Sequence, residues 1–165
     1  MAVRLVIVAC VIGLTAGPAH PSGAATASKT ARVALASRVP VARRQQMGAI
    51  VRAWSARLNA NDNAGIARLF AVPATLIQGP YVYRLVTRRQ IALWHSGLPC
   101  SGRIVSIAYR GRFATAVFRL GNRGATKCDQ PGTLAAARFE IVGGKIVSWA
   151  QVPVPERPTS PGTVA

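Results

Sequence analysis

The spacing of apolar residues predicts an amphipathic helix at the beginning of the part of the chain that is expected to fold. Met47, Ile50, Val51, Trp54 and Leu58 recur at steps of three, four and seven positions. Side chains at these steps form one stripe along a helix, and such a stripe is normally buried. We therefore expect a long helix that begins near residue 42 and packs against a sheet.

A second, shorter helix is predicted in the segment "NDNAGIARLF". Asp62 lies between two asparagines just before the apolar face of Ile66, Leu69 and Phe70. Asp and Asn are favoured N-cap residues, because their side-chain oxygens accept hydrogen bonds from free backbone N–H groups. Asp62 is therefore interpreted as a cap rather than a catalyst, and Pro73 is expected to end this helix.

A third helix is predicted to begin at Thr87. Gln90 follows three positions later, which is the pattern of a capping box. Ile91, Trp94 and Leu98 then lie on one face, and Pro99 follows them. Two β-rich runs separated by Gly79-Pro80 precede this helix and indicate a hairpin.

After Pro99 the hydrophobic period changes to two, which predicts strands. The run "RIVSIAYRGRFATAVFRL" gives two strands around Arg110-Gly111-Arg112, and "TLAAARFEIV" and "KIVSWAQV" give two more. Gly143-Gly144 between the last two is a strong hairpin signal. The order is helix, helix, two short strands, helix and a four-strand antiparallel meander, which predicts an α+β fold with helices on one side of a curved sheet.

This order, together with "NDNAGIARLF", the helix opened by Thr87 and "FEIVGGKIVSW", resembles the nuclear transport factor 2-like superfamily, especially its SnoaL-like branch. The resemblance covers nearly the whole predicted domain. It implies three N-terminal helices packed on a curved, mostly antiparallel sheet, with a conical pocket between the long helix and the sheet. Some members are isomerases, cyclases, dehydratases or epoxide hydrolases, whereas many only bind ligands or partner proteins, so the fold does not decide the function.

The two ends of the chain differ in composition from the predicted domain, which spans residues 42–153. Residues 1–27 have an early cation, a short apolar run and small residues, the pattern of a cleaved signal peptide. Residues 28–41 are interpreted as a flexible tether and the proline-rich residues 154–165 as a disordered tail. Secretion or association with the cell envelope is expected; lipid attachment at Cys10, which ends "IVAC", is a minor alternative.

The chain is strongly basic, with 21 Lys and Arg against four acids and a formal net charge of +17. The arginines are spread along the sequence, and an Ala-, Val-, Gly- and Arg-rich composition is typical of proteins from GC-rich, actinobacterial-looking genomes. A nucleic-acid site usually concentrates its charge and interleaves aromatic residues. We therefore expect no specific nucleic acid as a partner, and only loose attraction to an anionic cell-envelope surface.

Two cysteines follow the predicted signal peptide, Cys100 and Cys128. An oxidising compartment favours a disulfide between them. The alternative is a reactive thiol or a metal site that also uses His95 and Asp129, but neither a CxxC nor an HxxxH spacing supports it. The disulfide is preferred, and no metal and no cofactor are expected.

The candidates for chemistry are few. His95, Glu140 and Asp129 are weak catalytic candidates, since proton transfer needs a base with a tuned pKa inside the pocket. Glu140 alternates with Phe139 and Ile141, so its side chain points to the opposite face of the strand from theirs. It either pairs with an Arg on the outer face of the sheet or points into the pocket, and the sequence favours the outer face without deciding. Gln151 near the pocket floor cannot act as a base. The expected ligand-binding residues are Trp54, Tyr83, Trp94, His95 and Gln151.

The preferred hypothesis is a secreted domain that binds a small apolar ligand or a partner, without evident catalysis. One alternative is a SnoaL-like isomerase, cyclase or hydrolase that uses His95 with an acidic partner. Another is a cationic protein that adheres to the cell envelope. A homodimer formed through the sheet is also expected.

Overall fold

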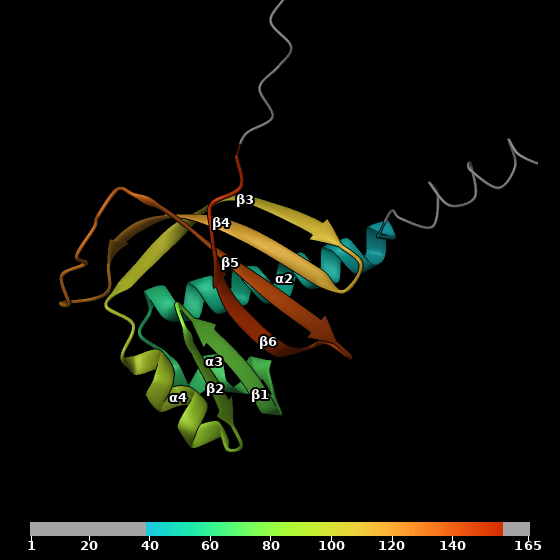
Figure 1. Ribbon diagram of the computed structural model, residues 1–165, viewed down its shortest axis with the longest axis horizontal. Helices are drawn as coiled ribbons and strands as arrows, with labels where there is room; N and C mark the ends of the chain where they lie inside the picture. Colours follow the sequence, from blue (N-terminus) through green and yellow to red (C-terminus); the bar gives the residue numbers. More distant parts are fainter. Residues whose placement is uncertain (1–38, 157–165) are drawn as a thin grey trace, which may run out of the picture.

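The structure, a computed structural model, describes residues 39–156 (Figure 1). The predicted signal peptide and almost all of the predicted tether and tail lie outside these residues. Within them, no helix is long and apolar enough to cross a membrane. The helices are α2 (Val41–Asn59), α3 (Asn63–Leu69) and α4 (Arg88–Ser96), and the strands are β1 (Phe70–Gln78), β2 (Tyr81–Leu85), β3 (Cys100–Arg110), β4 (Phe113–Asn122), β5 (Leu134–Val142) and β6 (Lys145–Val152).

The six strands form one sheet in the order β2-β1-β6-β5-β4-β3. All neighbours are antiparallel except β1 and β6, which pair in parallel and join the first hairpin to the later meander. The sheet is strongly curved, α2 runs along its inner face, and α3 and α4 lie beside β1 and β2 (Figure 1). The α+β fold class and the predicted element order are therefore confirmed.

The apolar stripe of α2 supplies much of the core. Met47, Val51, Trp54 and Leu58 are buried against inward-facing residues of the sheet such as Phe139. The burial of this stripe is the main reason that α2 is stable, because helices depend more on packing than on intrinsic propensity.

The predicted helix starts are present in the structure. The Asp62 carboxylate accepts a hydrogen bond from the backbone N–H of Gly65 at 2.7 Å, so Asp62 caps α3. Thr87 and Gln90 form a capping box that opens α4.

The predicted end of the second helix is wrong. α3 ends at Leu69, and both Phe70 and Pro73 belong to β1. The β1–β6 pairing is irregular between Phe70 and Thr75. A proline can be placed in this irregular part of the strand because no regular ladder hydrogen bond is required of it there.

Candidate functional site

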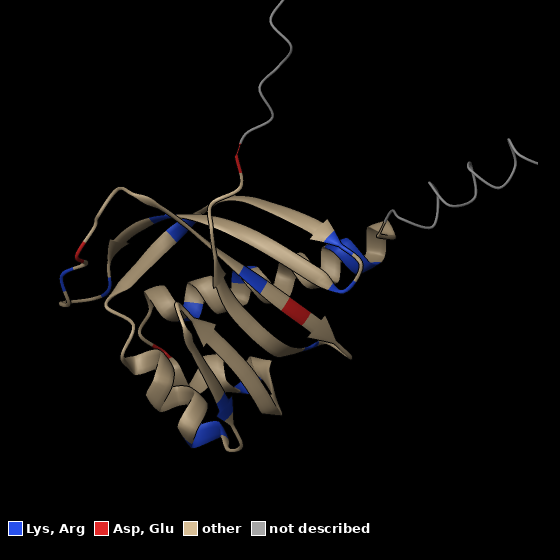
Figure 2. Ribbon diagram, in the orientation of Figure 1, with Lys and Arg blue, Asp and Glu red and all other residues tan. Residues whose placement is uncertain are grey.

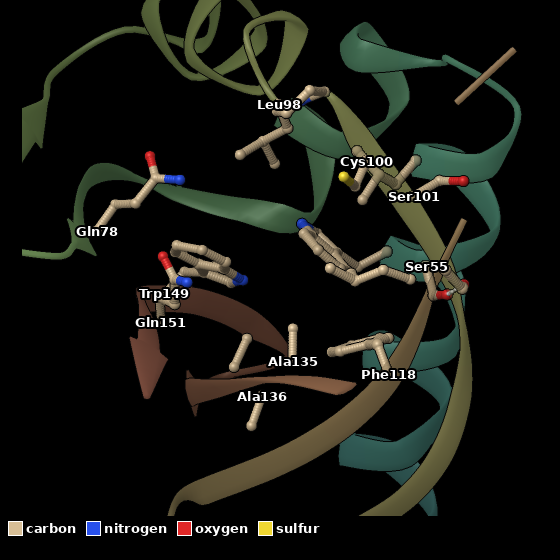
Figure 3. Close-up of a pocket in the computed structure, with 16 residues that line it drawn as sticks. Ser55, Gln78, Leu98, Cys100, Ser101, Phe118, Ala135, Ala136, Trp149 and Gln151 are labelled. Carbon is tan, nitrogen blue, oxygen red and sulfur yellow. Dashed lines mark hydrogen bonds between the residues drawn. The ribbon is translucent and has the colours of Figure 1, made fainter. Parts of the chain in front are cut away.

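A cavity of about 180 Å³ lies between α2 and the inner face of the sheet (Figure 3). Its residues come from α2, from the ends of β1 and β6, from the α4–β3 connection and from β3, β4 and β5. They are Trp54, Ser55, Leu58, Gln78, Leu98, Pro99, Cys100, Ser101, Gly102, Phe118, Leu120, Ala135, Ala136, Ala137, Trp149 and Gln151.

Small residues on β5 create the space. Ala135 and Ala137 have the same strand parity as Phe139, so all three face the inner side of the sheet. Phe139 is fully buried in the core. The cavity begins where β5 changes from Phe139 to the two alanines, because methyl groups there leave a volume that a larger side chain would fill.

The polar side chains in this wall fall into two groups, those that have a protein partner and those that have none. The Ser55 hydroxyl donates to the carbonyl oxygen of Gly102 at 3.2 Å, and the Ser101 hydroxyl donates to that of Asn122 at 2.6 Å. Within residues 39–156, by contrast, no hydrogen bond joins the side-chain amide of Gln78 or Gln151 to another protein group. The indole N–H of Trp149 is also buried without an acceptor.

His95 is fully buried behind Trp54, and both of its ring nitrogens are engaged. Nδ1 lies 2.8 Å from the carbonyl oxygen of Ile91, and Nε2 lies 3.1 Å from the indole nitrogen of Trp54. Because the indole can only donate, Nε2 accepts and the ring proton is on Nδ1. Burial lowers the pKa of His95 to about 4; the nearby positive charge of Arg123 adds to this, while the bond to Ile91 opposes it. His95 is therefore neutral at pH 7 and has no free nitrogen to act as a base.

The two other catalytic candidates also lie outside the cavity. Glu140 faces the opposite side of β5 from Phe139 and Ile141, and its carboxylate accepts from Arg112 Nε at 2.7 Å. Asp129 is exposed in the loop that follows β4. The structure does not bring His95, Glu140 and Asp129 together.

Arg123 and a disulfide fasten the rim of the cavity. The buried Arg123 guanidinium donates to the carbonyl oxygens of His95 and Leu98, the latter at 3.0 Å, and to the side chain of Asn63. Burial lowers the pKa of this guanidinium. Cys100 is bonded to Cys128, as the sequence predicted, and Cys100 is itself part of the cavity wall. No group of three or more potential metal ligands occurs in the described part of the chain.

Of the five expected ligand-binding residues, Trp54 and Gln151 line the cavity. Trp94 lies behind its wall, with its ring centroid 5.2 Å from that of Trp149, and Tyr83 packs on Trp94 at 6.1 Å. Trp94, Tyr83 and His95 are outside the lining, because Trp149 of β6 lies between Trp94 and the cavity and Trp54 covers His95.

Several wall residues were not predicted from the sequence, including Gln78, Trp149 and the alanines of β5. The alternation of Trp149 and Gln151 along β6 was a usable signal, because both must face the same side of the strand. No local sequence pattern indicated that Gln78 lines the cavity, because its spatial neighbour Gln151 comes from a distant part of the chain.

Neither the protein-family profiles nor the curated proteins contain a match to this sequence. Solved structures do match. A protein from Kribbella flavida provisionally assigned as a ketosteroid isomerase has a TM-score of 0.53 and 17% identity, over 73% of this chain and 88% of that one. A protein from Sinorhizobium meliloti provisionally assigned as a polyketide cyclase has a TM-score of 0.52 and 15% identity, over 65% and 98%.

A third similar structure is an NTF2-like protein of unknown function from Cytophaga hutchinsonii. It has a TM-score of 0.50 and 10% identity, over 70% of this chain and 92% of that one. At such identities the likeness concerns the fold, and fold alone does not assign an activity. The resemblance inferred from the sequence is confirmed at this level: the chain has the nuclear transport factor 2-like fold.

Proposed function

We propose that this chain is an exported domain that binds a small, uncharged and mainly apolar ligand in the cavity between α2 and the sheet, and that it performs no acid–base chemistry there. The observation that carries the proposal is the composition of the wall. Among the described residues that line the cavity there is no Asp, Glu, His, Lys, Arg or Tyr.

This composition favours binding over proton transfer. A general base must lie within hydrogen-bond reach of the proton that it removes. The Gln, Ser and Trp side chains of this wall cannot take up a proton near neutral pH. The alternative of an isomerase or cyclase that uses His95 is disfavoured because His95 is buried behind Trp54 with both nitrogens engaged.

The size of the cavity sets the expected ligand. An engineered apolar cavity of roughly 150 Å³ in another protein accommodates benzene. The cavity here is about 180 Å³, so it accommodates one ring, with further ligand atoms extending through its open end. Apolar and aromatic contacts with Trp54, Phe118 and Trp149 would supply most of the affinity.

Ligand-observed NMR with toluene tests the proposal. Toluene should show saturation transfer with the native protein and lose it in Ala135→Leu, which fills the cavity from β5. Ala56→Leu is the matched control, because Ala56 is exposed on α2 away from the cavity. Equal toluene binding by the Ala135→Leu variant and the native protein would show that the cavity is not the binding site. Native mass spectrometry of the secreted protein should also reveal a copurified neutral small molecule.

A further inference from the structure

Two glutamines lie side by side at the open end of the cavity. β1 and β6 pair in parallel, with Leu76 opposite Trp149 and Ile77 opposite Ala150. Gln78 and Gln151 are the next residues on the two strands, and both belong to the cavity wall. Figure 3 shows their amide groups on the same side of the cavity, next to Trp149.

These amides and the Trp149 indole have unused hydrogen-bonding capacity. Gln78 is half-buried and Gln151 is exposed, so water can hydrate both amides in the free protein. The Trp149 N–H is buried and has no acceptor within residues 39–156. Figure 3 shows the nitrogen edge of the Trp149 ring directed toward the middle of the lining residues. The part of the wall that a ligand can reach thus offers two amide groups, each with a donor and an acceptor.

The chemistry of this wall selects for a neutral polar group on the ligand. A carboxamide offers both an N–H donor and a carbonyl acceptor, so a pair of carboxamides complements a group that also offers both. An anion would lack a cationic partner among the lining residues, and burial of an unpaired ion is strongly unfavourable. The overall charge of +17 favours anion binding instead, because it attracts anions to the protein as a whole. Figure 2 shows that the Lys and Arg residues are scattered over helices, strands and loops.

We propose that the cavity takes a ring compound bearing an uncharged amide or lactam group, which Gln78 and Gln151 bind at the open end while the ring lies against Trp54 and Trp149. This inference rests on the proposed ligand-binding function and specifies the chemical class of the ligand. It also assigns Gln78 and Gln151 as the residues that determine specificity.

Three probes of nearly the same shape separate the competing effects. Benzamide carries the neutral amide, toluene replaces the amide by a methyl group, and benzoate replaces it by an anion. Their dissociation constants are measured by ligand-observed NMR titration at one ionic strength. The proteins are the native chain, the double variant Gln78→Met/Gln151→Met and the control Gln130→Met. Gln130 is exposed in the loop after β4 and lies outside the cavity wall.

The native protein and the Gln130→Met control should bind benzamide more tightly than benzoate. The double variant should bind benzamide roughly tenfold more weakly, a factor that corresponds to about 1.4 kcal/mol, whereas its affinity for toluene should change by less than about twofold. Methionine keeps the length of glutamine, so the shape of the cavity is preserved, and circular dichroism checks that the variants fold.

Two results would overturn the specificity inference while leaving the binding function intact. One is an unchanged ratio of benzamide to toluene affinity in the double variant. The other is benzoate binding as tight as benzamide binding, since net charge would then decide the selectivity. If none of the three probes binds the native protein, the proposed function itself fails and the specificity inference fails with it.

Discussion

Acidification should destabilise this protein through the protonation of His95. The pKa of His95 in the folded protein is lowered to about 4, mainly by burial, from an ordinary value of 6.5. The unfolded chain therefore binds more protons than the folded chain between these two values. Stability is at its full value above about pH 6.5 and is lost progressively as the pH falls toward about 4.

The magnitude follows from the difference between the two pKa values. Each pKa unit corresponds to about 1.4 kcal/mol. The free energy of unfolding should therefore be lower by roughly 2–3 kcal/mol at about pH 4.5 than at neutral pH. That is a large share of the 5–15 kcal/mol typical of a folded domain. Asp62 does not contribute in this window: its pKa is lowered, first by the hydrogen bond from the Gly65 N–H, and its stabilising effect is lost only below its ordinary value of 3.8.

Urea unfolding of the native chain and of His95→Gln, measured at several values between about pH 7.5 and about pH 4.5, tests this prediction. Glutamine can donate to the Ile91 carbonyl and accept from Trp54, but it does not titrate. The free energy of unfolding of the native chain should fall by roughly 2–3 kcal/mol more than that of the variant. Contributions from His20, which lies outside the described residues, cancel in this difference.

Two outcomes would refute the reasoning about His95. If both proteins lost stability in parallel, His95 would not be the titrating group. If the native chain had the same stability at about pH 4.5 as at neutral pH, the ring would be accessible to protons in the folded state. It would then be a better catalytic candidate than its burial behind Trp54 implies.

Two further predictions concern the rim of the cavity. Cys128→Ser should lower the free energy of unfolding by roughly 3–4 kcal/mol, because the native bridge closes a span of 28 positions, and reductant should affect the native chain but not the variant in urea unfolding. Arg123→Met should destabilise the fold by more than about 2 kcal/mol, because the carbonyl oxygens of His95 and Leu98 would lose a buried donor. If Arg123→Met unfolded at the same temperature as the native protein in a thermal melt, the stabilising role of Arg123 would be contradicted.

Features that depend on local sequence were predicted well. The caps at Asp62 and Thr87 act within three residues of themselves, and the Gly143-Gly144 turn fixes the pairing of β5 with β6 through immediate neighbours. Pro73 is the exception among these local signals. It was expected to end a helix, but the pairing of β1 with β6 draws Phe70 into a strand that also contains the proline.

The arrangement of the site depended on non-local contacts and could not be predicted in the same way. The sequence does not reveal that β1 lies beside β6, so the proximity of Gln78 and Gln151 could not be predicted from it. Trp94 was correctly predicted to lie on the third helix, but it was wrongly expected to contact the ligand, because Trp149 lies between Trp94 and the cavity and its position depends on how the sheet curves. The burial of His95 likewise depends on Trp54, which comes from a different helix.

The register of β5 links the absence of a base in the cavity to the stability of the fold. For Glu140 to face the cavity, β5 would have to shift by one residue, which would turn Phe139 and Ile141 to the outer face. These side chains are 0% and 4% exposed, and exposing each would cost about 1.5–3 kcal/mol. The same shift would turn Leu134 and Arg138 toward the cavity, where their larger side chains would fill the room that Ala135 and Ala137 leave for a ligand. It would also separate Glu140 from Arg112. The packing that opens the cavity is therefore also the packing that directs the β5 carboxylate outward, which is why we infer binding rather than proton transfer at this site.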